Sequence, residues 1–172
     1  MQISDKTLYT DVVYNAIKAE DKERIKELAT THLLGCNIWD IELGILLQFI
    51  NGDFSATKVD ANAHEAGGVT IFVRLFFEQV ADFISEFAEK YKNLTPAPNN
   101  DERLASRGCL EITFSENLLY FTRSYFGLHS FTDCEKIKVA EILIAKKDVY
   151  NSTIFQRNFA EIEKQKLKSR KK

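Results

Sequence analysis

The chain has 172 residues, of which 45% are hydrophobic and 28% charged, and a chain of this length and composition can fold around one core without a disulfide or a metal. Three widely spaced cysteines, an N-terminus without a signal-peptide pattern and the lack of an apolar run that could span a bilayer predict a protein that is not secreted and does not enter a membrane. The net charge of −2 is unevenly distributed. The last nine residues, KQKLKSRKK, hold six of the 23 basic residues, so the rest of the chain carries 17 basic and 25 acidic residues, or −8.

The first third of the chain predicts a helical hairpin followed by a buried helix. Apolar residues recur at helical spacing over residues 4–19, and again between a capping Asp21 and a stop at Gly35. The stretch from Asn37, NIWDIELGILLQFINGD, is apolar on nearly all sides. We therefore expect one buried helix there, which ends at Asn51-Gly52 as a left-handed cap.

The middle of the chain predicts a long loop and a long helix. Residues 54–68 are polar and aperiodic, and a loop of this length is usually functional or mobile. After Gly67-Gly68 the pattern predicts a helix of about six turns, although a strand over residues 69–77 is a weaker alternative. The Pro-containing stretch 93–100, NLTPAPNN, then forms an exposed elbow. The core face of the predicted helix comprises Phe72, Phe76, Val80, Phe83, Phe87 and Tyr91.

Two capping boxes predict the helices of the C-terminal half. Thr113 with Glu116 begins a helix that Gly127 stops, and Thr132 with Glu135 begins a second helix. The second helix bears Val139, Ala140, Leu143 and Ile144, and it can continue through Ile154, Phe159 and Ile162 into the basic tail. A helix of that length would project from the body of the protein.

The stretch between these two helices, RSYFGLHSF, concentrates aromatic side chains in a turn. One interpretation is a helix–helix corner in which Leu128 and Phe131 pack onto the core. The other is an exposed aromatic corner that binds a partner.

No arrangement of residues in the sequence identifies a reaction. His32 and Cys36 have a spacing that could share a metal, but Gly35 breaks the helix and no other ligand lies near in sequence. His129 with Asp133 and Cys134 is a similar group, but Thr132 starts a new helix between them. Cys134 near a helix start is either an activated thiol or, more commonly, a buried inert one. His64-Glu65 in the long loop could act in acid–base chemistry, but no nucleophile accompanies it.

Two stretches of the C-terminal third, YFGLHSF (125–131) and IAKKDVYN (144–151) ahead of the basic end, resemble small helical proteins of tailed bacteriophages. The resemblance is to proteins of the tail-assembly-chaperone or head–tail connector type and covers about seventy residues. It implies a role as a virion structural or assembly protein, in the cytoplasm or within a virus particle, and it assigns no site residue.

We therefore expect a mostly α, single-domain bundle of five to six helices over residues 1–162, with a long internal loop and a basic C-terminal tail over residues 163–172. We predict a non-enzymatic protein–protein interaction or assembly function without cofactor or metal, with other proteins of one assembly, or further copies of the chain, as partners. The alternatives are a nucleic-acid-associated module that uses the tail and, third, a small enzyme. The candidate partner-binding residues are Lys164, Lys166, Lys168, Arg170, Lys171 and Lys172 in the tail, and Tyr125, Phe126, His129 and Phe131 in the corner.

Overall fold

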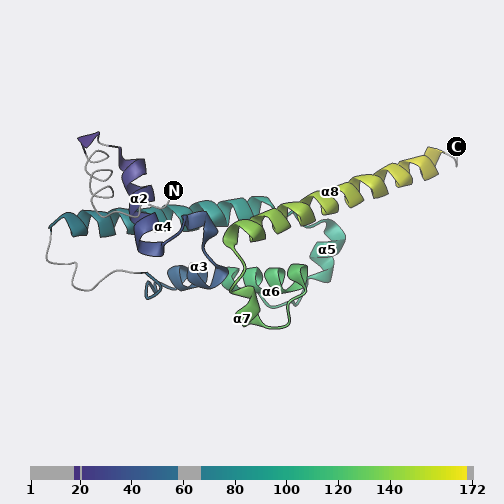
Figure 1. Cartoon of the computed structure of the whole chain (residues 1–172). Coiled ribbons are helices and arrows are strands. Elements are labelled where there is room, and N and C mark those ends of the chain that lie inside the picture. Colours follow the sequence, from purple (N-terminus) through teal and green to yellow (C-terminus); the bar gives the residue numbers. More distant parts are fainter. Residues whose placement is uncertain (1–17, 20, 58–66, 170–172) are drawn as a thin grey trace. The chain divides into compact units, whose positions relative to one another are not determined.

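The computed structural model describes residues 18–19, 21–57 and 67–169, coloured along the sequence in Figure 1. Within these ranges the chain forms seven α-helices, one 3-10 helix and no β-strand, so the mostly helical fold predicted from the sequence is confirmed. The predicted first helix, residues 4–19, lies almost wholly outside the described ranges. The alternative strand over residues 69–77 is wrong, because these residues are helical.

The chain divides into two compact units, Met1–Glu86 and Phe87–Lys172. Helix α4 (Gly67–Asn93) supplies residues to both of them. Our expectation of a single domain over residues 1–162, with a tail over residues 163–172, stays a prediction.

The first described helix of unit 1, α2 (Lys22–Leu34), begins and ends where its caps predict. The side chain of Asp21 accepts a hydrogen bond from the backbone N–H of Arg24 at 3.0 Å. Gly35 takes the left-handed conformation, with φ of 76°, and its N–H donates to the carbonyl of Thr31. Both caps join residues only three or four positions apart, which is why the sequence pattern suffices to place them.

The single helix predicted from Asn37 is wrong, because two helical segments replace it. A 3-10 helix, η1 (Ile38–Asp40), is followed by extended backbone at Ile41 and Glu42 and then by α3 (Leu43–Ile50). The side chain of Asn37 accepts from the N–H of Trp39 at 2.9 Å, and this local bond favours a tight turn over a continuous helix. The predicted left-handed stop after α3 is confirmed, at Gly52 with φ of 76°.

The core of unit 1 forms against the aromatic face of α4. Phe76, Val80 and Phe83 are buried there, as the sequence predicts. The ring of Trp39 meets Phe83 edge-on, with centroids 4.8 Å apart, and Phe49 of α3 meets Phe76 in the same way at 6.2 Å. The predicted burial of Phe87, which belongs to unit 2, is confirmed as well.

Unit 2 contains a short helix that the sequence analysis missed, α5 (Asn100–Ala105), at the end of the predicted elbow. Asn99 and Glu102 form a reciprocal capping box, a signal that is present in the sequence. Arg157 holds this segment against the last helix of the chain. Its guanidinium donates to the carbonyl of Ala97 at 3.0 Å and to both carboxylate oxygens of Glu102 at 2.9 and 3.0 Å.

The next helix, α6 (Phe114–Phe126), starts at the predicted capping box of Thr113 and Glu116. It ends at Gly127, which has φ of 64° and is the predicted stop.

The second predicted capping box, Thr132 with Glu135, is wrong. Ser130 caps a four-residue helix, α7 (Phe131–Cys134), through its hydroxyl, which accepts from the N–H of Asp133 at 3.1 Å. Ser130 and Thr132 are each followed three positions later by an acidic residue. The sequence pattern alone therefore does not decide which of the two hydroxyl residues caps the helix.

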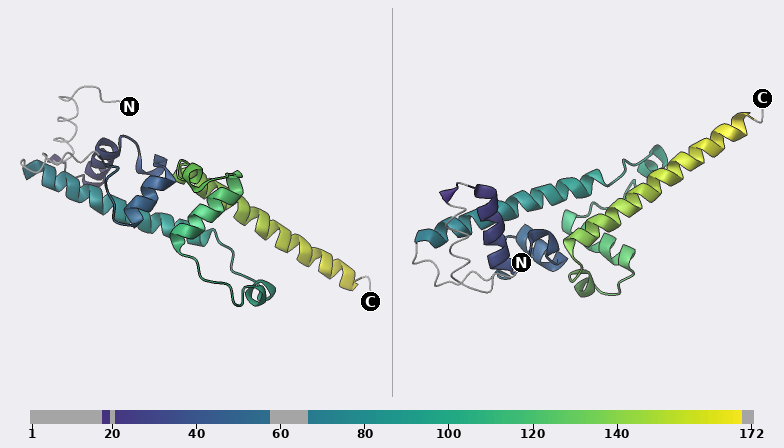
Figure 2. Two further views of the ribbon diagram at one scale, coloured as in Figure 1. Left: turned by 90° about the horizontal axis from the view of Figure 1, so that it is seen from below. Right: turned by 45° about the horizontal axis from the view of Figure 1, so that its top comes forward.

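The last helix, α8 (Val139–Ser169), is 31 residues long, and Figure 2 shows it as one long helix that leads to the C-terminus. The burial of its residues changes along its length. Its first turns enter the core of unit 2, which also takes residues from α4, α6 and α7. Beyond Arg157 every described residue is exposed, so the predicted projecting C-terminal helix is confirmed. The buried residues of unit 2 are Phe87, Tyr91, Leu118, Thr122, Cys134, Val139, Ile142 and Ala145.

Candidate functional site

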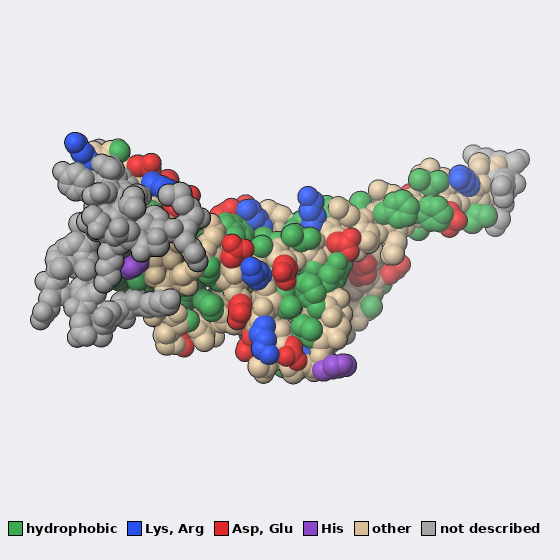
Figure 3. Space-filling model, in the orientation of Figure 1, with side chains coloured by type: hydrophobic (Ala, Val, Ile, Leu, Met, Phe, Trp, Pro, Cys, Tyr) green, Lys and Arg blue, Asp and Glu red, His purple; other side chains and the backbone are tan. Residues whose placement is uncertain are grey.

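Helix α8 carries large apolar side chains on the side that faces away from the core of unit 2. At about 100° of rotation per residue, four of these positions fall within a sector of about 60°. They are Ile144, 69% exposed, Phe155, 69%, Phe159, 52%, and Ile162, 49%. We name these four residues the apolar stripe. The rings of Phe155 and Phe159 stack on each other in solvent, with centroids 6.3 Å apart, and Figure 3 shows hydrophobic side chains gathered on the projecting part of α8.

The apolar stripe was not recognised from the sequence as a surface. Ile144, Phe159 and Ile162 were assigned to the apolar face of the predicted helix, but the residues of α8 that enter the core are Val139, Ile142 and Ala145. Sequence periodicity shows that apolar residues share a face, and only packing shows which face is covered.

The basic residues of the predicted tail continue the exposed part of α8. Lys164, Lys166 and Lys168 are helical and exposed, whereas Arg170, Lys171 and Lys172 lie outside the described residues. Helix geometry places Lys166 on the same side as the apolar stripe, within about 20° of Phe155. Lys164 and Lys168 lie on the other side of the helix.

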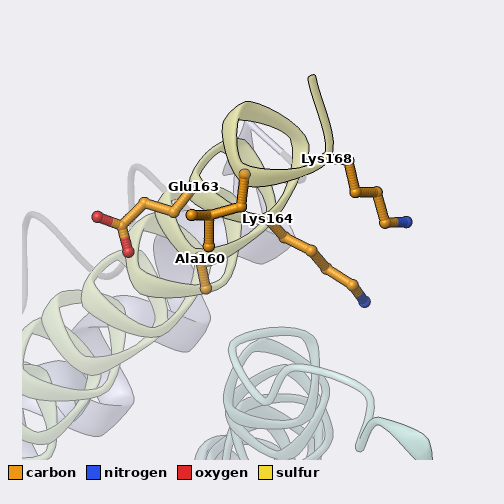
Figure 4. Close-up of a pocket in the computed structure, with 5 residues that line it drawn as sticks. Ala160, Glu163, Lys164 and Lys168 are labelled. Atoms are coloured by element: carbon orange, nitrogen blue, oxygen red, sulfur yellow. The ribbon is translucent and has the colours of Figure 1, made fainter. Parts of the chain in front are cut away.

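The side of α8 that carries Lys164 has a shallow depression (Figure 4). The carboxylate of Glu163 points to one side of it and the ammonium groups of Lys164 and Lys168 point to the other. All the lining residues belong to one helix and are exposed, so the depression is open to solvent and lacks the walls that would enclose a ligand. They are Ala160, Glu163, Lys164, Leu167 and Lys168.

The corner between α6 and α7 is exposed and aromatic. Phe131 is 40% exposed and does not pack into the core, which corrects one of the two interpretations of this turn. Its ring lies beneath the guanidinium of Arg123, 5.3 Å away, and against the ring of Tyr120, with centroids 5.7 Å apart. Of the other corner residues, His129 is exposed, and Phe126 and Leu128 are half-buried.

The structure brings one corner residue to α8 but leaves the corner apart from the tail. Tyr125 is exposed, and its hydroxyl donates to the carboxylate of Asp148 at 3.0 Å, a bond that raises the pKa of Tyr125. Asp148 precedes Lys164 by sixteen residues, or about 24 Å of helix. The two predicted groups of partner-binding residues therefore form two separate surfaces.

A half-buried lysine that the sequence analysis did not single out links three helices of unit 2. The ammonium of Lys146 in α8 lies 4.4 Å from the ring centre of Tyr91 and 4.8 Å from that of Phe121. Removal from water lowers the pKa of Lys146 and raises that of Tyr91. The hydroxyl of Tyr91 donates to the side chain of Asn117 at 2.8 Å. Ring faces attract a cation, so this contact stabilises the packing of α4, α6 and α8.

The cysteines and histidines do not assemble into a site within the part of the chain that is described. Cys134 is buried, and burial raises the pKa of its thiol, which fits the inert alternative and not the activated one. His32 is exposed and Cys36 half-buried. Among the described residues no group of three or more His, Cys, Asp or Glu side chains could hold a metal, and none of the helices is both long and apolar enough to cross a membrane. His64-Glu65 lies outside these residues.

Comparison with known proteins gives no match to a family model, to a curated protein or to a solved structure.

Proposed function

We propose that this chain is a non-enzymatic interaction protein of a larger assembly, and that it binds a protein partner through the exposed half of α8. The observation that carries the proposal is the apolar stripe on a helix whose described residues beyond Arg157 are all exposed. A helix is stabilised mainly by packing of its apolar face, and here that face is turned to solvent. A partner that covers the stripe supplies the missing packing.

The resemblance of residues 125–131 and 144–151 to tailed-bacteriophage proteins extends this proposal. On that basis the chain is a structural or assembly component of a virus particle, present in the cytoplasm or in the particle itself. The aromatic corner at Tyr125 and Phe131 is then a second contact surface.

A nucleic-acid contact through the basic tail is the alternative function. The six basic residues between Lys164 and Lys172 favour it, because they could neutralise several phosphates. Two observations favour the protein contact. The rest of the chain carries −8, which opposes the approach of a polyanion, and no aromatic residue lies among the basic ones to stack on a base.

The test compares three chains: the full-length protein, a chain truncated after Arg157, and a full-length double variant, Phe155→Asp with Phe159→Asp. The truncated chain keeps the ion pair of Arg157 with Glu102. Each is titrated across a salt series with duplex DNA and with the proteins encoded beside this one.

We expect both altered chains to lose binding to a neighbour-encoded protein and none of the three to bind DNA tightly. If the truncation alone removes DNA binding, with a salt slope of several units, the nucleic-acid alternative is correct. If all three chains behave alike with every ligand, the exposed half of α8 has no binding role.

A further inference from the structure

We infer that the partner on the apolar stripe is a second copy of this chain, with the two α8 helices paired antiparallel about a two-fold axis near Arg157. This inference deepens the proposed function and rests on it, because it names the occupant of the same surface. Two-fold pairing of identical surfaces is the most common way in which soluble proteins form oligomers.

The spacing of residues along α8 makes the exposed face complementary to itself. In an antiparallel pair centred at Arg157, residues equally far from it on opposite sides lie at the same height. Phe155 and Phe159 are each two residues from the centre, so each Phe155 meets the Phe159 of the other copy. Asp148 and Lys166 are each nine residues from it, and they face each other on the same side of the helix, within about 20° of Phe155.

Arg157 contacts its own chain on the opposite side of α8. Its guanidinium points away from the apolar stripe, toward the carbonyl of Ala97 and the carboxylate of Glu102. On the exposed face, the hydrogen bond from Tyr125 holds the carboxylate of Asp148 in place before any partner arrives.

The charges along α8 favour the antiparallel orientation. A parallel pair in register would set Lys166 against Lys166 and Asp148 against Asp148 on the paired faces. The antiparallel pair instead sets Lys166 of each copy beside Asp148 of the other, which is exposed. Such like-charge clashes and opposite-charge pairs are what select orientation in paired helices. The charge of the whole chain agrees, since a tail of six basic residues meets a body of −8.

The apolar area predicts a weak dimer. The contact centre consists of two Phe155–Phe159 pairs, and a buried aromatic side chain removes about 150–250 Å² from water. With Ile162 of each copy the interface lies at or below about 1,200 Å² in total, which is the range of transient complexes. We therefore expect a dimer that forms and dissociates with protein concentration.

The first experiment is sedimentation velocity of the full chain over a concentration series at low and at high salt. We expect a monomer–dimer equilibrium that salt weakens, and no dimer in the Phe155→Asp, Phe159→Asp double variant. Lys166→Glu should weaken dimerisation about tenfold, because it replaces the two exposed ion pairs of the dimer with two like-charge repulsions. Combining it with Asp148→Lys should restore the dimer.

The matched control is Lys164→Glu, which makes the same charge change on the other side of α8. It should leave the dimerisation constant within about threefold of the unaltered chain. Circular dichroism at 222 nm confirms that each variant keeps its helices. Equal weakening by Lys164→Glu and Lys166→Glu would overturn the proposed register.

The second experiment tests orientation with a short bismaleimide that links two cysteines, in a Cys109→Ser background because Cys109 is exposed. Asn158→Cys, one residue from the centre, should link to its own copy. Ile144→Cys should not form this link. Residue 144 lies thirteen residues from the centre, so the two introduced cysteines are about 39 Å apart along the helix axis. A linked Ile144→Cys dimer would show parallel pairing.

A full chain that stays monomeric at every concentration overturns the inference. The proposed function is tested independently of that outcome. A monomer that binds a neighbour-encoded protein, and loses that binding in the stripe double variant, refutes self-pairing and supports the proposed function.

Discussion

The burial of the aromatic face of α4 can be tested with Phe83→Ala. Phe83 is 3% exposed, and its ring meets Trp39 edge-on at 4.8 Å. Removing a buried phenylalanine side chain costs about 3–5 kcal/mol, which combines the lost transfer free energy and the cavity left behind. The contact with Trp39 supplies about 0.5–1.5 kcal/mol of that loss, as aromatic pairs do beyond their buried area. We therefore expect the free energy of unfolding to fall by about 3–5 kcal/mol.

The assay is urea denaturation followed by two signals. Trp39 is the one tryptophan of the chain and lies in unit 1, so its fluorescence reports on the unit that the substitution changes. Because Phe83→Ala also alters the surroundings of Trp39 directly, circular dichroism at 222 nm must report a matching loss.

The control is Phe77→Ala, which removes the same side chain from the same helix. Phe77 is 39% exposed, although its ring contacts Phe54 and Phe76. We expect its loss to be less than half of that for Phe83→Ala. A loss below about 1 kcal/mol for Phe83→Ala, or equal losses for the two variants, would refute the assignment of this face to the core and recast it as an interface.

Three further predictions concern unit 2. Thr122 is fully buried, and its hydroxyl has no hydrogen-bond partner among the described residues, so Thr122→Val should raise the free energy of unfolding by about 1 kcal/mol in a denaturant titration; a decrease would show that the hydroxyl is bonded. Tyr91→Phe keeps the ring but removes the hydrogen bond to Asn117, and we expect a loss of about 1 kcal/mol by the same method, whereas no change would mean that the bond adds nothing to stability. In thiol labelling of the native protein followed by mass spectrometry, exposed Cys109 should react well before Cys134, whose pKa is raised by burial; comparable rates would contradict the packing of α7.

The sequence alone determined those features that depend on neighbours in the chain. The caps at Asp21 and Gly35, the capping box of Thr113 and Glu116, and the stop at Gly127 were all predicted at the residues where they occur. Each of them joins groups within about four positions, so the sequence contains both partners. The aromatic core face of α4 was predictable for a related reason, since a period of 3.6 residues recurs over many turns.

Tertiary structure decided between local signals of similar strength. Ser130 and Thr132 both satisfy the pattern of a helix cap, and only the packed structure selects Ser130. The helix expected from Asn37 is interrupted at Ile41, where the burial of a side chain that is 1% exposed adds to the local preference for a turn set by the Asn37 bond. The burial of a side chain at such a position outweighs the helical preference of the segment, because propensity differences are below about 1 kcal/mol per residue.

The apolar stripe on α8 likewise depends partly on the sequence and partly on tertiary packing. The sequence determined that a long helix ends in a basic tail and that apolar residues recur along it. Which of those residues enter the core was decided by the packing of α8 in unit 2, where Val139, Ile142 and Ala145 are covered and Phe155 and Ile162 are left in solvent. Periodicity shows which residues share one face of a helix, but it does not show whether another part of the chain covers that face. An apolar stripe is therefore a candidate binding surface only when the fold leaves it exposed to solvent.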